Sequence, residues 1–170
     1  MTFIQWGEPM TNLTPIDWAK RPLQKYADFS GRAPRAEYWW FTLAVVVVLV
    51  VVSIIEDIVG LGGMIFGAYG PLSGLFYLAI LLPSIAVGVR RLHDTNRPGW
   101  WMLPTIVFYA AAFLVGGRDM MERSPTPAVA LAGILILIGA VFGLVLLIFY
   151  CLAGTRGDNR YGPDPYAGEA

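Results

Sequence analysis

The chain has 170 residues, of which 56% are hydrophobic and only 14% are charged, and its 12 basic residues balance its 12 acidic ones. This composition lies far from the average of soluble domains and leaves room for one compact bundle without a separate soluble domain. The single cysteine, Cys151, excludes an internal disulfide and a cysteine-based metal cluster.

The first predicted element is a short helix within Thr14–Phe29, where aromatic and aliphatic side chains are mixed with cations. Such a pattern is typical of an amphipathic helix that lies in the headgroup layer of a membrane. Pro22 limits the length of this helix or starts its main part. The alternative is a solvated tail before the first membrane span. Residues 1–37 together form the predicted N-terminal segment on the cytoplasmic side.

Four apolar runs follow, and none of them contains Asp, Glu, Lys, Arg or His. An α-helix rises about 1.5 Å per residue, so about 20 apolar residues cross the hydrocarbon core of a bilayer. Three runs have 18 residues and the fourth has 25. We therefore predict an all-α integral membrane bundle of four transmembrane helices within residues 38–152, built from Tyr38–Ile55, Leu72–Val89, Trp100–Gly117 and Ala128–Leu152.

Particular residues in and between these runs predict local features. Pro83 lies in the middle of the second run, where it removes a backbone N–H and predicts a kink. Gly139 and Gly143 form a Gly-x-x-x-Gly pair, a spacing that allows close helix contact but also arises by chance. The loop Glu56–Pro71 is rich in glycine and apolar, and we expect it to fold back against the outer membrane surface.

The distribution of basic residues predicts the orientation in the membrane. Ten lysines and arginines lie in the N-terminal segment, the middle loop and the C-terminal tail, whereas the other two loops carry two. Cytoplasmic loops of membrane proteins carry an excess of Lys and Arg. Both termini are therefore predicted to be cytoplasmic, and the tail formed by residues 153–170 faces the same side as residues 1–37.

Three polar stretches, residues 31–37, 90–101 and 154–165, meet at the predicted cytoplasmic end of the bundle. Arginine pairs in a two-pronged manner with carboxylates and with phosphates. One hypothesis is a structural network, in which the arginines of the middle stretch pair with Glu37, Asp94 and Asp164. The other is a site for anionic lipid headgroups, held by those arginines that carboxylates do not satisfy. The candidate ligand-binding residues are Arg32, Arg35, Arg90, Arg91, His93, Asp94 and Arg97, and the structural polar residues are Glu37, Asn159 and Asp164.

An alternative function is a membrane-embedded enzyme or transporter that acts on a phosphate-bearing or lipid substrate through His93, Asp94 and the nearby arginines. Imidazole titrates near neutrality, which suits acid–base chemistry. However, no Ser or Cys stands in a nucleophile motif, one histidine is a poor basis for a metal site, and no run carries a charge. We therefore predict no catalytic residue, no metal and no cofactor. The expected partners are membrane lipids, anionic ones among them, and a protein partner or second copy, but no nucleic acid.

The three stretches resemble the signatures of the domain of unknown function 805 family, which are small bacterial inner-membrane proteins. The resemblance spans roughly Tyr26 to Asp164, and Pro98 departs from the small polar residue expected there. It implies four helices in the bacterial inner membrane and no established activity. The motifs that carry it are Gly31-Arg32-x-x-Arg35-x-Glu37-Tyr38-Trp39, then Arg90-Arg91-Leu92-His93-Asp94 with Gly99-Trp100-Trp101, and Asn159-x-Tyr161-Gly162-Pro163-Asp164-Pro165.

Overall fold

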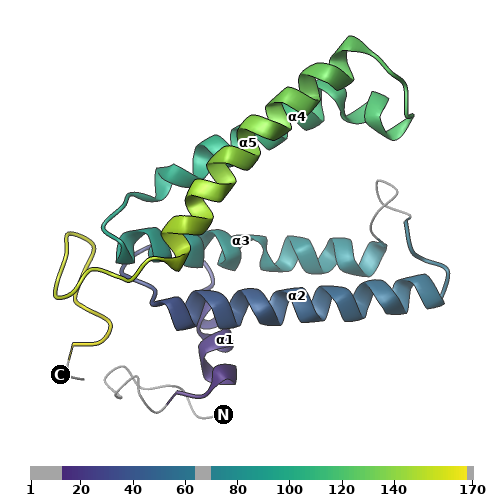
Figure 1. Cartoon of the computed structure of the whole chain (residues 1–170). Coiled ribbons are helices and arrows are strands. Elements are labelled where there is room, and N and C mark those ends of the chain that lie inside the picture. Colours follow the sequence, from purple (N-terminus) through teal and green to yellow (C-terminus); the bar gives the residue numbers. More distant parts are fainter. Residues whose placement is uncertain (1–12, 64–69, 168–170) are drawn as a thin grey trace.

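The computed structural model describes residues 13–63 and 70–167, and the regular structure within them is helical (Figure 1). The expected fold-back of the first loop involves residues 64–69, which lie outside the described ranges. The helices in chain order are α1 (Pro15–Gln24), α2 (Arg35–Ile58), α3 (Pro71–Asp94), the 3-10 helix η2 (Gly99–Met102), α4 (Leu103–Met121) and α5 (Pro127–Cys151).

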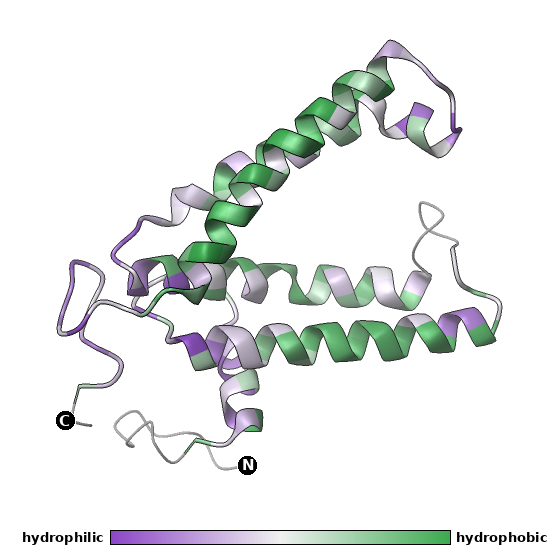
Figure 2. Cartoon of the chain, in the orientation of Figure 1, coloured by the Kyte–Doolittle hydropathy of each residue, from purple (hydrophilic) through white to green (hydrophobic). Residues whose placement is uncertain are grey.

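Four of these helices are long and apolar enough to cross a membrane, which confirms the predicted spans. The spans cover 24, 24, 22 and 25 residues, the third one, Gly99–Met120, being made of η2 and most of α4. They are longer than three of the apolar runs because helical structure continues into the flanks of those runs. Figure 2 shows this pattern, with hydrophobic residues along the helices and hydrophilic residues gathered toward their ends. Arg35 and Glu37 thus belong to the first turn of α2, and Arg91 and His93 to the last turn of α3.

Helix α1 confirms the short helix predicted before the first span. Thr14 caps it: its side chain accepts a hydrogen bond from the Asp17 backbone N–H, and the Asp17 carboxylate accepts one from the Thr14 backbone N–H. This reciprocal arrangement satisfies two N–H groups that a helix start leaves open. Pro22 lies inside the helix, and both Trp18 and Pro22 are buried. In Figure 1, α1 runs crosswise to α2 near the start of that helix.

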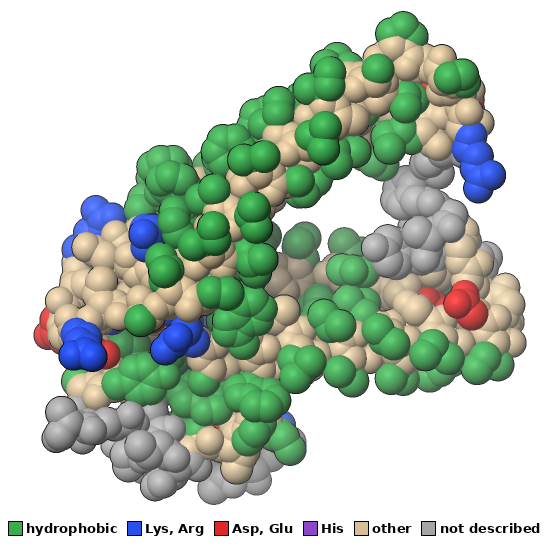
Figure 3. All heavy atoms as spheres, in the orientation of Figure 1, with side chains coloured by type: hydrophobic (Ala, Val, Ile, Leu, Met, Phe, Trp, Pro, Cys, Tyr) green, Lys and Arg blue, Asp and Glu red, His purple; other side chains and the backbone are tan. Residues whose placement is uncertain are grey.

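The long helices form two hairpins, α2 with α3 and α4 with α5. Helices α4 and α5 make the most extensive contact in the described structure, whereas α5 touches α2 and α3 only slightly. The two hairpins meet at one end of the molecule and diverge toward the other (Figure 1). Figure 3 shows hydrophobic side chains along the opening between them. The junction of the hairpins therefore depends on the residues at the end where they meet.

Small residues allow α4 and α5 to approach closely. A Cβ atom on Gly116 would lie 2.6 Å from the Cβ of Ala132, so only glycine fits this position without a shift. Gly139 approaches the Cβ of Phe108, which would lie 3.3 Å from an added Cβ, while Gly143 has a looser environment. One member of the Gly-x-x-x-Gly pair thus serves close packing within this hairpin.

At the end away from this junction, Glu56 joins α2 to α3. Its side chain is buried, with Oε1 accepting hydrogen bonds from the backbone N–H of Leu72 and of Ser73, at 2.5 and 3.1 Å. Its Oε2 accepts a third from the hydroxyl of Ser73, at 2.7 Å. A carboxylate from one helix therefore caps the first turn of the next, where free N–H groups and the helix dipole favour negative charge.

Candidate functional site

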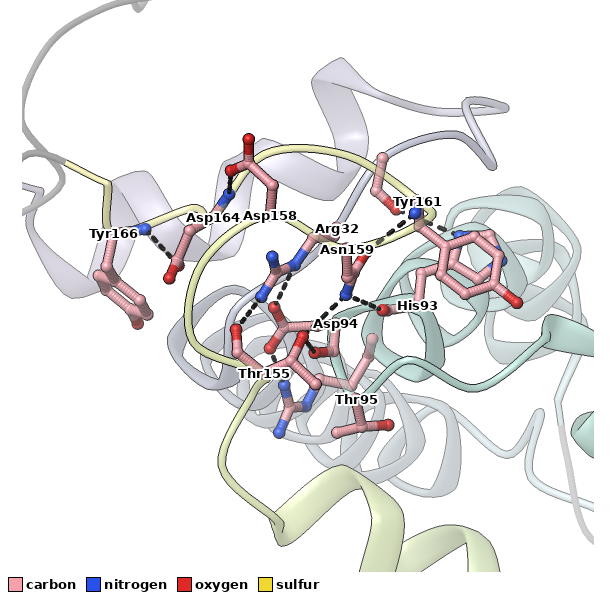
Figure 4. Close-up of polar contacts among 12 residues, drawn as sticks. Arg32, His93, Asp94, Thr95, Thr155, Asp158, Asn159, Tyr161, Asp164 and Tyr166 are labelled. Carbon is pink, nitrogen blue, oxygen red and sulfur yellow. Dashed lines mark hydrogen bonds and ion pairs between the residues drawn. The ribbon is translucent and has the colours of Figure 1, made fainter.

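The polar end of the bundle brings together the three stretches that the sequence indicated. The chain before α2, the last turn of α3 and the tail after α5 converge around Asp94 (Figure 4). We call Arg32, Arg91, Asp94, Thr155 and Asn159 the Asp94 cluster. Its members come from positions more than 120 residues apart, since Arg32 contacts Thr155 and Gly157. The cluster therefore joins the segment before α2 and the tail after α5 to the end of α3.

Asp94 is shared by two buried arginines. Its Oδ1 lies 3.0 Å from Arg32 Nε, and its Oδ2 accepts a hydrogen bond from Arg91 Nη1. Asp94 itself is only 3% exposed. Removing two cations and one carboxylate from water is costly, so the arrangement is stable only if the remaining N–H groups find acceptors.

Backbone carbonyl groups supply those acceptors. Arg32 donates from Nη1 to Gly157 O and from Nη2 to Thr155 O, at 2.7 and 2.5 Å. Arg91 donates from Nε to Tyr150 O, at 3.1 Å, and from Nη2 to Leu152 O. The end of a helix leaves its last carbonyl groups without N–H donors, so Arg91 also caps α5. Every guanidinium nitrogen of Arg32 and Arg91 thus donates a hydrogen bond to an oxygen atom of the protein.

Residues of the tail after α5 complete the cluster by donating hydrogen bonds to the end of α3. The Thr155 backbone N–H donates to Asp94 O at 2.9 Å, and the Asn159 side chain donates to His93 O at 3.0 Å. These bonds satisfy carbonyl groups at the end of α3. A Cβ on Gly154 would come within 2.2 Å of Asp94 Oδ2, so this position requires glycine for the close approach of the tail.

The His93 ring packs against the tail. Its ring stacks on Tyr161 with centroids 3.9 Å apart and planes inclined by 3°, and its Nδ1 lies 3.1 Å from Gly31 O. No ion pair joins this ring to a carboxylate in the described part of the chain. Likewise, residues 13–63 and 70–167 contain no group of three or more His, Cys, Asp or Glu side chains able to hold a metal ion. This geometry supports a packing role more than acid–base catalysis.

A second buried ion pair lies beneath α1. Arg90 Nη2 is 3.0 Å from Glu37 Oε1, and Arg21 Nε is 3.6 Å from Glu37 Oε2. Arg90 is fully buried and Glu37 is 1% exposed. The geometry nevertheless falls short of a hydrogen bond: none of the three guanidinium nitrogens of Arg90 has a hydrogen-bond partner among the described residues, and neither carboxylate oxygen of Glu37 has one. We call Arg90 and Glu37 the Arg90 pair.

The remaining candidates lie at the edge of the site. Arg35 is exposed, and Arg97 donates to Thr95 O while its guanidinium carbon lies 4.0 Å from the ring centroid of Phe149. Asp164 accepts hydrogen bonds from the backbone N–H of Tyr166 and of Gly157, at 3.0 and 2.7 Å, instead of pairing with an arginine of the middle stretch. These two donors hold the pKa of Asp164 below its ordinary value.

The structural hypothesis from the sequence paired the arginines of the middle stretch with Glu37, Asp94 and Asp164. The structure contains Arg90–Glu37 and Arg91–Asp94, whereas Asp164 accepts from backbone N–H groups instead. Sequence reasoning missed the carbonyl acceptors, because every residue has a carbonyl group and none can be told apart in a sequence. It also missed Gly154 and Thr155. The Gly-Thr dipeptide directly after an apolar run was the available signal, since it combines a residue without a side chain with a hydroxyl donor.

Comparison with known proteins places these residues in a family. A family model described as "Protein of unknown function (DUF805)" matches residues 26–163, which include both buried pairs. The chain belongs to this family. The match confirms the resemblance found in the three polar stretches.

Members of the family with similar sequences occur in Escherichia coli K12. "Inner membrane protein YhaI" is 36% identical over 153 residues, which cover 90% of this chain and 98% of YhaI. "Inner membrane protein YhaH" is 33% identical over 150 residues, covering 88% and 97%. "Uncharacterized protein YiiR" is 29% identical over 143 residues, covering 80% and 84%. No solved structure matches. Together with the four apolar helices, these relatives identify this family member as a multi-pass inner-membrane protein.

Proposed function

We propose that this protein is an interaction module of the bacterial inner membrane, with both termini in the cytoplasm. In this proposal the Asp94 cluster is a structural joint that holds the two helical hairpins and both chain ends together. Exposed cations around that joint bind anionic lipid headgroups. The enzyme or transporter alternative would need a free acid–base group at the polar end. His93 stacks on Tyr161 and Asp94 is shared by two arginines, so neither is arranged for that role.

The observation that carries this proposal is the complete commitment of Arg32 and Arg91. Each donates to Asp94 and to two backbone carbonyl oxygens. A lipid phosphate could enter only by displacing these acceptors, and breaking a buried ion pair costs about 3–5 kcal/mol. The cluster therefore suits a permanent joint and does not suit reversible binding of a headgroup.

Headgroup binding in this proposal belongs to the exposed arginines at the same end. Arg35 is exposed at the start of α2, and Arg156 and Arg160 are exposed in the tail. Figure 3 shows several Lys and Arg side chains gathered there. Trp39 and Trp40, which follow Arg35 in the sequence, are exposed, and so is Trp100 in η2, as in the aromatic belts of membrane interfaces. Cations near the cytoplasmic surface attract anionic lipids with about 1 kcal/mol each.

The orientation is tested by cysteine labelling. In a Cys151→Ser background, single cysteines at Asp158 and Glu122 occupy exposed positions near opposite ends of the bundle. On intact spheroplasts an impermeant thiol reagent should label Glu122→Cys, and it should label Asp158→Cys only after lysis. The reverse pattern would overturn the cytoplasmic placement of the termini.

Lipid binding is tested by native mass spectrometry of protein released from mixed-lipid nanodiscs. The wild type should retain phosphatidylglycerol and cardiolipin in preference to zwitterionic lipid, and this preference should weaken as salt rises. Joint replacement of Arg35, Arg156 and Arg160 by Gln should reduce the preference. The matched control replaces Arg118 and Arg123, exposed cations beside the other end of α4, and should leave the preference intact. Equal retention of both lipid classes by the wild type would contradict the proposal.

A further inference from the structure

The Arg90 pair and the Asp94 cluster are both buried, but they differ in how their hydrogen-bonding groups are used. Every guanidinium nitrogen of Arg32 and Arg91 donates a hydrogen bond to a protein oxygen. Arg90 donates none with its side chain, although it is fully buried. Its contact with Glu37 is an ion pair through Nη2 alone. Nε and Nη1 of its guanidinium group therefore face no protein acceptor among the described residues, and Nη2 has only the ion pair with Glu37.

An unsatisfied buried guanidinium group is rare, because it carries five N–H donors and loses their hydration on burial. Each donor left without an acceptor costs about 1–3 kcal/mol, and more for a charged group. Glu37 cannot offset this cost, since both of its own oxygens also lack hydrogen bonds. The Arg90 pair therefore lacks a third group whose oxygen atoms accept hydrogen bonds from Arg90.

The charges around the Arg90 pair indicate that this third group is an anion. Arg21 lies 3.6 Å from Glu37, and Lys25 interacts electrostatically with both Glu37 and Arg90. The opposing acids are Glu37 and Asp28, and Asp28 is already bonded to the hydroxyl and the backbone N–H of Ser30. Three cations thus face two carboxylates, one of which is committed elsewhere. Burial lowers the pKa of Lys25, because desolvation disfavours its charged form.

We propose that the Arg90 pair beneath α1 is a binding site for one phosphate-type oxyanion. Its oxygens accept hydrogen bonds from Nη1 and Nη2 of Arg90, the two terminal nitrogens whose N–H groups lie side by side, and Arg21 and Lys25 supply further positive charge. Two planar N–H groups side by side match two oxygens of a phosphate group. Helix α1 reaches the site through Arg21, and its side chains Trp18 and Pro22 are buried. The ligand is a lipid phosphodiester or free phosphate. This site is separate from the exposed arginines of the proposed function.

Glu37 gives the proposal a test that a purely structural role would fail. Its carboxylate competes with the oxyanion for Arg90, so Glu37→Gln should bind phosphate about fivefold more tightly than the wild type, and Lys25→Gln about fivefold more weakly. The control is Lys20→Gln, an exposed cation in α1, which should bind as the wild type does. Arg90→Gln should abolish binding, but it also breaks a buried pair. The other variants test the site even if this one does not fold.

The measurement is the thermal unfolding temperature of the full chain in a neutral detergent, titrated with inorganic phosphate at constant ionic strength balanced by chloride. A second arm uses short-chain phosphatidylglycerol, with the matching phosphatidylcholine as its zwitterionic control. Stabilisation by phosphate assigns the site to the free anion, and stabilisation by phosphatidylglycerol alone assigns it to a lipid. No stabilisation in either arm, or equal stabilisation of the Glu37, Lys25 and wild-type forms, would overturn the proposal. The shift should persist after replacement of Arg35, Arg156 and Arg160, which separates it from the proposed function.

Discussion

The hydroxyl group of Tyr26 donates a hydrogen bond to the backbone carbonyl oxygen of Ala79, 53 residues further along the chain. Ala79 lies four residues before Pro83, so it would normally accept from the N–H that proline lacks. The segment after α1 thus satisfies a carbonyl group that α3 cannot satisfy by itself. This bond also anchors the N-terminal segment to α3.

This relationship predicts a specific coupling between two substitutions. Tyr26→Phe should lower the free energy of unfolding by about 1–2 kcal/mol, because it leaves the Ala79 carbonyl without a donor. In a Pro83→Ala background the restored backbone N–H takes that carbonyl, and the effect of Tyr26→Phe should nearly vanish. Chemical unfolding in detergent gives the free energy of unfolding of the wild type, the two single variants and the double variant, which together form a double-mutant cycle. Equal losses in both backgrounds would show that the hydroxyl acts elsewhere.

Asp94 should be among the most sensitive positions of the polar end. Asp94→Asn removes the charge shared by Arg32 and Arg91 and leaves two buried cations without a counter-charge, at a cost of about 3–5 kcal/mol. Glu122→Gln is the matched control, since its pair with Arg118 is exposed and worth about 1 kcal/mol or less. Thermal unfolding in detergent should separate the two variants clearly. A similar, small loss in both would mean that water reaches the Asp94 cluster.

Glu56 should act as the cap of α3 despite its place in α2. Glu56→Ala removes three hydrogen bonds to Leu72 and Ser73, and we expect a loss of about 1–2 kcal/mol together with faster amide exchange at the start of α3. The neighbouring Asp57 is exposed, so Asp57→Ala should change little. Hydrogen–deuterium exchange mass spectrometry reports both. Unchanged exchange at Leu72 and Ser73 would refute the capping role.

The order of the tail should depend on pH through Asp164. Its pKa is lowered in the folded state by the backbone N–H groups of Tyr166 and Gly157, so its contribution is complete at neutral pH. It declines as the pH falls below the ordinary value of 3.8 and is lost below the lowered pKa. Asp164→Asn removes the charge at every pH. Proteolysis of the tail, with an acid-tolerant protease, should therefore distinguish wild type from variant at pH 7, and the difference should shrink as the pH falls below 3.8. A constant difference would contradict the assignment.

Gly116 and Gly133 provide a matched pair in the α4–α5 hairpin. A Cβ on Gly116 would lie 2.6 Å from the Cβ of Ala132 and 2.8 Å from Ala128 O, whereas a Cβ on Gly133 meets nothing within 4 Å. Gly116→Ala should therefore destabilise the protein by about 1–3 kcal/mol through overpacking. Gly133→Ala should be neutral or stabilise by up to about 1 kcal/mol. If both variants match the wild type in thermal unfolding, the hairpin is not packed through Gly116.

The sequence predicted those features that follow from hydropathy and from charge. Four uncharged runs sufficed for the spans, and the arginines at the ends of these runs required carboxylates nearby, which led to Glu37 and Asp94. Helix α1 was also predictable, because Thr14 and Asp17 stand at capping-box spacing with a proline between them.

Other contacts depend on how the helices pack, which hydropathy does not encode. Glu56 stands at the start of the predicted first loop, yet it belongs to α2 and its carboxylate reaches the start of α3. Tyr26 appeared as one aromatic residue among several, and its partner is a backbone oxygen without a sequence signature. The divergence of the two hairpins was likewise not predictable, since apolar faces of all four helices look alike in sequence.

The position of the tail in the Asp94 cluster has a consequence for biosynthesis. Synthesis proceeds from the N-terminus, so Arg32 is made before any of the long helices, whereas its acceptors Thr155 and Gly157 are made after all of them. Until residues 155–157 are made, Arg32 has Asp94 but lacks both of its carbonyl acceptors, whereas Arg91 already has Tyr150 and Leu152. A chain that ends before residue 155 therefore leaves the guanidinium group of Arg32 only partly bonded, and the joint between the two hairpins closes as the last step of synthesis.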